Sequence, residues 1–167
     1  MFRSLNDFHD VWKDEATTTQ KVLASLTDAS LAQAVSNDHR TLGRMAWHLA
    51  QTIPEMMSKT GLTVEGADEH APVPASAKAI ADAYARSAVS LPDQIRAKWT
   101  DKSLDEKDEM YGEKWARSFT LRVLLMHQAH HRGQMSVLMR QAGLPMPSIY
   151  GPTKEEWAQW NMQPPAV

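Results

Sequence analysis

Residues 118–145 read SFTLRVLLMHQAHHRGQMSVLMRQAGLP and contain the strongest helical pattern in the chain. Ser118 is a suitable N-cap, while Gly143 and Pro145 are typical of the residues that follow a helix. We therefore expect a helix over residues 119–142. Its apolar residues recur at helical spacing, at Leu121, Leu124, Leu125, Met135, Leu138 and Met139.

Two more helices are expected in the first third of the chain. Ser4 can cap the first, whose apolar residues keep a helical spacing as far as Leu26. The second begins between Asp38 and Thr41. Pro54 is expected to kink or end it, because proline lacks an amide donor.

The middle of the chain predicts a long loop over residues 61–76, followed by a helix over 75–99 that Pro92 interrupts. Residues 101–117 are charged and lack strand alternation, so they are expected to be irregular. Further along, residues 153–156 form a capping box that opens a short helix.

These patterns predict an all-α fold, an up-down four-helix bundle with a short C-terminal helix, as a single domain over residues 1–167. A formal net charge of −2 argues against a nucleic-acid partner, which needs a basic surface. The chain has no cysteine, which excludes disulfides, thiolate metal sites and a cysteine nucleophile. We see neither a signal peptide nor a membrane-spanning run, so we expect a cytoplasmic protein with no membrane partner.

The histidines carry the chemical signal of this sequence. His127 and His131 are four residues apart, so a helix projects both from one face and both could ligate one ion. His130, three residues from His127, could compete for that role. His48 is the best third ligand, because it lies at the edge of an apolar helical stripe. The alternative is a bundle with packed histidines and no metal.

Three segments resemble the DinB family of damage-inducible four-helix-bundle metalloproteins. They are residues 127–145, with His-Gln-Ala-His-His-Arg-Gly-Gln followed by Arg-Gln-Ala-Gly-Leu-Pro, residues 40–50 around Trp-His-Leu, and residues 149–157. The resemblance implies that His48, His127 and His131 are the metal ligands. It also implies a divalent zinc, nickel or iron ion, a homodimer and a role in stress response. Some relatives are S-transferases that use a low-molecular-weight thiol, and others are described as metal-dependent hydrolases.

Three neutral imidazoles leave at least one coordination position open, as in catalytic metal sites. Gln134 follows His131 by three residues and Gln51 follows His48 by three, so either amide could make a second hydrogen bond that orients a ligand. Gln134 is favoured because it belongs to the family motif. Glu55 is the only candidate for a general base, and the sequence assigns no catalytic residue.

Neighbours of the ligand pair are expected to have structural roles. Arg132 points away from the histidine face, which predicts a surface or dimer-interface ion pair. Met126, Met135 and Met139 are expected in the core. Gly133 is expected to permit close approach of another helix, since a mid-helix glycine costs about 1 kcal/mol relative to alanine.

The leading functional hypothesis is a metal-dependent thiol S-transferase or hydrolase that acts on a small electrophilic substrate. The alternative is a non-catalytic, metal-binding stress-response dimer. An enzyme requires an open metal position that faces a cavity of roughly 300 Å³ or more, whereas a binding protein can close its site.

Overall fold

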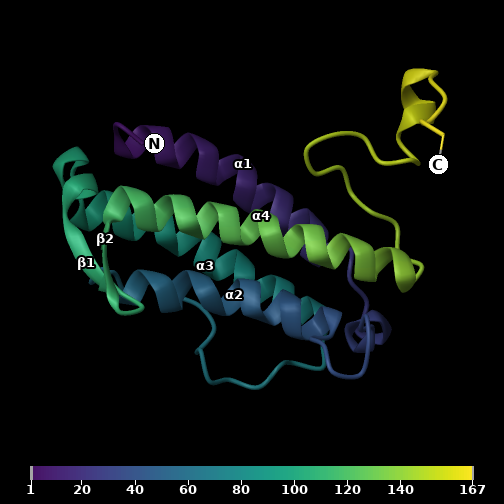
Figure 1. The fold of residues 1–167 in the computed structure, drawn as a ribbon, viewed down its shortest axis with the longest axis horizontal. Helices are drawn as coiled ribbons and strands as arrows, with labels where there is room; N and C mark the ends of the chain where they lie inside the picture. The colour runs from purple at the N-terminus through teal and green to yellow at the C-terminus, as the bar shows by residue number, and fades with distance from the viewer. Residues whose placement is uncertain (1, 167) are drawn as a thin grey trace.

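The structure is a computed structural model and describes residues 2–166. Four long helices form the body of the molecule (Figure 1). They are α1 (Leu5–Ala24), α2 (Leu42–Ser58), α3 (Ala77–Lys98) and α4 (Arg117–Gln141). Short 3₁₀ helices follow α1 (η1, Asp28–Ala32) and α3 (η2, Asp101–Asp105), and a third lies near the C-terminus (η3, Trp157–Trp160).

The helices pack in a ring in which α1 and α2 each contact both α3 and α4. α1 and α3 are antiparallel, because the Leu5 amide donates to Asp101 Oδ1 at 2.8 Å and the Ala77 amide donates to Asp28 Oδ1 at 2.7 Å. α2 runs in the same direction as α3, and α4 in the same direction as α1 (Figure 1). The order of directions is therefore up-down-down-up.

The expected up-down alternation is thus wrong for the second and third helices. A helix of 17 residues is about 25 Å long. The loop over residues 59–76 is long enough to return along that whole length, since an extended chain covers about 3.3 Å per residue. The length of this loop is therefore the feature of the sequence that indicates that the second and third helices are parallel.

The expectation of a purely helical chain is also corrected. Strands β1 (Lys107–Met110) and β2 (Glu113–Ala116) form an antiparallel hairpin at one end of the bundle (Figure 1). Tyr111 and Gly112 connect them with φ angles of 55° and 86°. Two-residue hairpin turns require such positive φ angles, and glycine adopts them at little cost. These strands are short and rich in charged residues, so they lack the alternation of apolar and polar residues that indicates a strand.

Neither helical proline ends its helix. α3 continues through Pro92, although proline cannot donate to the carbonyl of Ala88 one turn earlier. The indole of Trp12 on α1 donates to that carbonyl at 2.9 Å. An inter-helix hydrogen bond therefore replaces the one that the proline removes.

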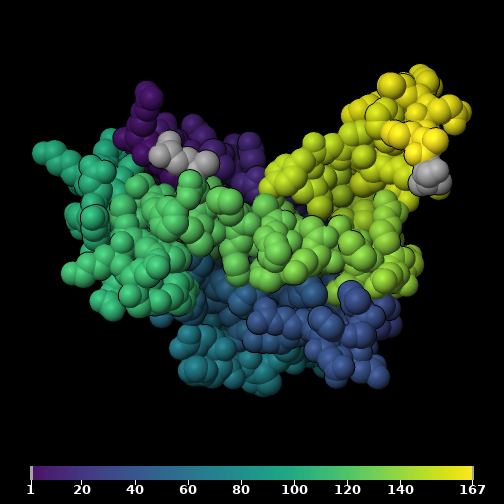
Figure 2. All heavy atoms as spheres, in the orientation of Figure 1, coloured from purple at the N-terminus to yellow at the C-terminus, as the bar shows by residue number. Residues whose placement is uncertain are grey.

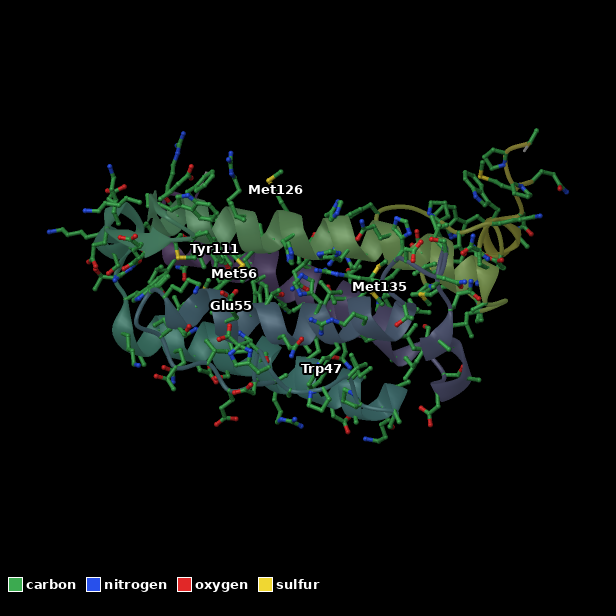
Figure 3. All side chains as sticks on the ribbon, turned by 60° about the horizontal axis from the view of Figure 1, so that its bottom comes forward. Trp47, Glu55, Met56, Tyr111, Met126 and Met135 are labelled. Atoms are coloured by element: carbon green, nitrogen blue, oxygen red, sulfur yellow. The ribbon has the colours of Figure 1, made fainter. Side chains whose placement is uncertain are left out.

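Two expectations about α4 are corrected. Met135 and Met139 are buried as expected, but Met126 is 61% exposed and points outward (Figure 3). Gly133 does not permit close helix packing, because a methyl group there would meet no described atom within 4 Å. Its face of α4 is open to solvent.

The C-terminal segment rises from the body of the molecule beyond α4 (Figure 2). The expected capping box at residues 153–156 forms only in part, because the Thr153 amide donates to Glu156 Oε2 at 2.7 Å but the Thr153 hydroxyl has no partner, and η3 begins at Trp157. Within residues 2–166, no helix combines the length and the apolar composition that crossing a membrane requires.

Candidate metal centre

The packing of α2 against α4 brings three imidazoles together. His48 lies near the middle of α2, and His127 and His131 lie one turn apart on the face of α4 that meets it. Thr41 caps α2 by accepting from the Arg44 amide at 3.1 Å, which fixes the start of the helix that carries His48. The predicted convergence of the three histidines is confirmed.

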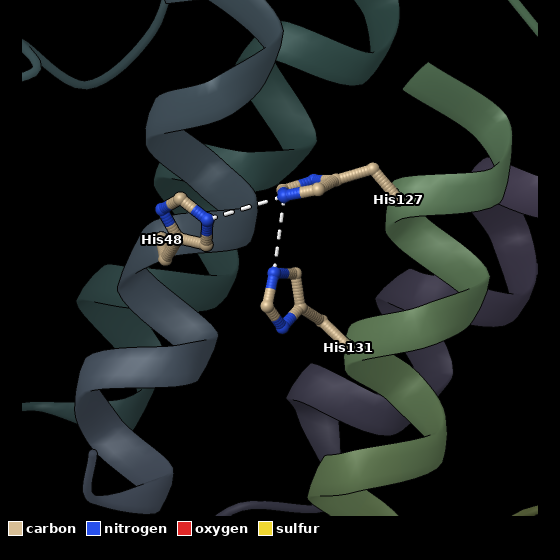
Figure 4. Close-up of side chains that lie close together, drawn as sticks. All are labelled: His48, His127 and His131. Carbon is tan, nitrogen blue, oxygen red and sulfur yellow. Dashed lines mark hydrogen bonds between the residues drawn. The ribbon is translucent and has the colours of Figure 1, made fainter. Parts of the chain in front are cut away.

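The ring nitrogens of the three histidines face one another (Figure 4). His127 Nε2 lies 3.1 Å from His131 Nε2 and 3.3 Å from His48 Nε2. Two imidazole nitrogens on one tetrahedral zinc ion would be about 3.4 Å apart, given Zn–N bonds of about 2.05 Å. The donor set and its spacing therefore fit a divalent ion bound by three Nε2 atoms. In the part of the chain that is described, no carboxylate joins this group.

Gln134 determines which nitrogen of His131 is available. Gln134 Oε1 lies 2.7 Å from His131 Nδ1, and an amide oxygen can only accept a hydrogen bond. His131 Nδ1 must therefore carry the proton, which leaves the lone pair of Nε2 directed at the other two imidazoles. The expected contact between Gln134 and His131 is present.

Burial keeps these imidazoles in the neutral form that a metal ion requires. It lowers the pKa of His48 to about 3 and that of His127 to about 4, and the other histidines of the cluster add to both effects. Burial also lowers the pKa of His131. The Nδ1 of His127 is buried without a hydrogen-bond partner. His130 is exposed and lies outside the cluster.

Gln51 does not contact His48. Its Oε1 accepts from Arg44 Nη1 at 2.8 Å, and its Nε2 donates to three loop carbonyls, those of Asp68, Glu69 and Ala71. This amide fastens the loop over residues 59–76 to α2. The buried indole of Trp47 has a similar role and donates to Ala71 O at 2.9 Å (Figure 3).

Glu55 is already engaged by two other side chains. Its carboxylate accepts from the Tyr111 hydroxyl at 2.7 Å and pairs with Lys59 at 3.1 Å (Figure 3). It lies two helical turns beyond His48, which is about 10 Å along the axis. Glu55 therefore anchors the tip of the hairpin to α2, and the structure gives it no contact with the imidazoles.

A cavity of about 550 Å³ opens beside the imidazole cluster. His131 and Gln134 line it from α4, and Met45 lines it from α2. Arg40, which the sequence analysis missed, also lines it, and its position directly before the N-cap of α2 was the available signal. A larger groove of about 700 Å³ lies between α1 and α3 and includes none of the three imidazoles.

Arg132 is fully buried, so the surface or interface ion pair expected for it is wrong. Its guanidinium pairs with Glu15 of α1, donates to Thr19 Oγ1 at 2.7 Å, and contacts the hydroxyl of Tyr150. Position 132 is rotated by about 100° from 131 on the helix, which directs it toward α1 rather than toward solvent. The residue beside a candidate ligand is thus part of a separate structural cluster.

Comparisons with known proteins bear on the family and the fold of this chain. The sequence model of the DinB family matches residues 1–162. An uncharacterised protein of Bacillus subtilis strain 168, YrdA, is 46% identical over 167 residues, which is the full length of both chains. The crystal structure of a DinB-like protein from Bacillus cereus ATCC 10987 is 45% identical with a TM-score of 0.86, over 90% of this chain and 100% of that one. A DinB-like protein from B. subtilis, YjoA, shares the fold at 15% identity, with a TM-score of 0.67 over 86% and 96% of the two chains.

Proposed function

This chain belongs to the DinB family, and we propose that it is a metal-dependent enzyme, a thiol S-transferase or a hydrolase of small electrophiles. In this proposal His48, His127 and His131 hold a divalent zinc, nickel or iron ion. The supporting observation is the convergence of three imidazoles, in which His127 Nε2 lies 3.1 Å from His131 Nε2 and 3.3 Å from His48 Nε2, with the tautomer of His131 set by Gln134. A divalent ion bound there would act as a Lewis acid and lower the pKa of a water or thiol that reached it.

The residues around the cluster support an enzyme more than a closed binding site. Three protein ligands leave a coordination position for another molecule. The cavity of about 550 Å³ beside His131 exceeds the roughly 300 Å³ of a small-molecule site. Because the chain has no cysteine, a thiol nucleophile must be carried by a bound small molecule, whereas hydrolysis would use water.

Proton transfer is not assigned to a carboxylate of the chain. Glu55, the candidate base, is held by Tyr111 and Lys59. The Nδ1–H of His131 is held by Gln134 and is not free to leave. The chain's own contribution is therefore to orient the imidazoles, keep them neutral and partly exclude water from the centre.

Metal analysis of protein purified without a polyhistidine tag tests the first half of the proposal. We expect close to one divalent ion per chain, and its loss in the His131→Ala variant. A thiol-transfer screen with small electrophiles, paired with an ester hydrolysis screen, then tests the second half. A protein that binds metal but turns over no substrate in either screen would favour the non-catalytic, metal-binding alternative.

We also propose a homodimer, on the strength of the family resemblance. A stable dimer buries roughly 1,000 Å² or more in total. Light scattering at micromolar concentration measures the mass directly, and a monomer at that concentration would contradict the dimer while leaving the metal centre untouched.

A further inference from the structure

The cavity beside the imidazole cluster is lined by two charged side chains, Arg40 and Asp38. Arg40 is exposed and lies immediately before Thr41, the N-cap of α2. Among the described residues, no carboxylate lies within 4 Å of its guanidinium, whereas Arg117 and Arg132 have such partners. Arg40 is therefore free to pair with an anion that enters the cavity.

Arg40 shares this cavity with His131, which belongs to the imidazole cluster. A ligand that pairs with Arg40 inside the cavity therefore lies beside the cluster.

The rest of the cavity wall is mainly apolar. Met45 and Leu138 are buried at its base, and Val35 and Val137 lie at its mouth with 61% and 54% of their surface exposed. Exposed valines beside a polar centre provide contact area for the apolar body of a ligand. The cavity therefore combines a mainly apolar wall with one arginine and one aspartate.

The charges on the cavity wall favour an anion with a single negative charge. Asp38 also lines the cavity, and its carboxylate would repel a dianion such as a phosphate monoester. His39 lies between Asp38 and Arg40, and its Nδ1 is 2.6 Å from Ser36 Oγ. A guanidinium matches the two oxygens of one carboxylate in a bidentate pair.

We propose that Arg40 binds the carboxylate of a small molecule whose apolar body lies along Met45, Val137 and Leu138, with its other end beside His131. This inference rests on the proposed function, because it names the class of substrate as a monocarboxylic acid with an apolar body. Arg40 is a specificity residue in this arrangement, and no chemical step depends on it.

Binding of hexanoate to the metal-free protein, measured by calorimetry, is the direct test. Hexanamide has the same shape without the charge and serves as the matched probe. We expect hexanoate to bind at least about tenfold more tightly than hexanamide, because hydrogen bonds to charged groups are stronger than those between neutral groups. Arg40→Gln should remove this difference and leave hexanamide binding unchanged.

Arg86→Gln is the matched control, because Arg86 is an exposed arginine outside this cavity. It should leave both probes unaffected. Val137→Ser should weaken both probes alike. The proposal is overturned if hexanoate does not bind, if it binds no better than hexanamide, or if Arg40→Gln and Arg86→Gln behave identically.

The His48→Ala variant separates this inference from the proposed function, because His48 does not line the cavity. We expect it to lose zinc and keep Arg40-dependent hexanoate binding. A parent protein that binds hexanoate through Arg40 but binds no zinc would refute the metal centre and leave the carboxylate subsite in place. A parent that binds zinc but not hexanoate would refute the carboxylate subsite and leave the metal centre in place.

Discussion

His131 and Arg132 are adjacent in sequence and both buried, with 7% and 0% of their surface exposed, yet they belong to clusters of different kinds. His131 faces α2 and meets two other imidazoles. Arg132 faces α1 and meets the carboxylate of Glu15, the hydroxyl of Thr19 and the hydroxyl of Tyr150.

The two clusters differ in whether the protein satisfies its own polar groups. Around Arg132, the Nη1 and Nη2 donors meet acceptors and opposite charges are paired, and only its Nε has no hydrogen-bond partner, so the cluster is largely complete without a ligand. Around His131, ring nitrogens of three histidines face one another, and no described carboxylate belongs to this group. Buried polar groups need partners. The first cluster is therefore structural, and the second is arranged for something that binds.

Removal of Arg132 should cause the largest loss of stability. Arg132→Met leaves the Glu15 carboxylate without its partner, and breaking a buried pair costs about 3–5 kcal/mol. We expect about 3 kcal/mol, because Glu15 is still 17% exposed. The thermal midpoint of the metal-free protein, followed by circular dichroism, should fall by about 6–12 °C.

The control for this change is Arg140→Met, which removes an exposed pair with Glu155. Exposed pairs contribute little, so the midpoint should hardly move. If Arg132→Met is as mild as Arg140→Met, the buried cluster is not structural. If the folded Arg132→Met protein loses its metal, the two clusters are coupled rather than separate.

His131→Ala should have the opposite profile, with a large effect on metal binding and a small effect on folding. We expect zinc affinity, measured by competition with a chelating dye, to fall about a hundredfold or more, since a ligand is lost. Helical circular dichroism should stay unchanged, because the four-helix core is apolar and independent of the ion. His130→Ala, which changes an exposed neighbour, should keep the parent affinity. Unfolding of the parent on removal of its metal would contradict this division of roles.

Gln134 offers a finer test of how the imidazole cluster is oriented. Gln134→Leu removes the acceptor for His131 Nδ1, and loss of such a partner typically lowers metal affinity about 10–100-fold. Gln134→Glu keeps an acceptor at the same place and should retain most of the affinity. Equal affinities for the leucine and glutamate variants would show that the hydrogen bond does not orient the ligand.

The difference between these two clusters also marks the limit of what the sequence could predict. Four-residue spacing is enough to place His127 and His131 on one face, and the periodicity of α2 adds His48. The same periodicity says that Arg132 points elsewhere, but it cannot say whether that side is solvent or another helix. Only the ring order of the helices places α1 there.

Long-range hydrogen bonds were equally beyond local reasoning. Gln51 has the spacing of a His48 partner, yet its side-chain amide donates instead to carbonyls of the loop over residues 59–76, which folds back against α2. Pro92 has the signature of a helix end, yet Trp12, distant in sequence, donates to the carbonyl that the proline leaves free. In both cases a tertiary contact outweighs a local preference.

The last and smallest expected effect is the response of the two clusters to pH. Burial holds the pKa of His48 at about 3, below its ordinary value of 6.5. At a pH between these two values, His48 is protonated in the unfolded chain but stays neutral in the folded chain. The stability contributed by neutral His48 is therefore complete above pH 6.5 and is lost as pH falls toward 3. Urea midpoints of the metal-free parent and of His48→Asn should thus converge between pH 6.5 and 5, with the parent falling more steeply. His130→Ala should follow the parent, and parallel curves for parent and His48→Asn would mean that the imidazole is solvated rather than held neutral.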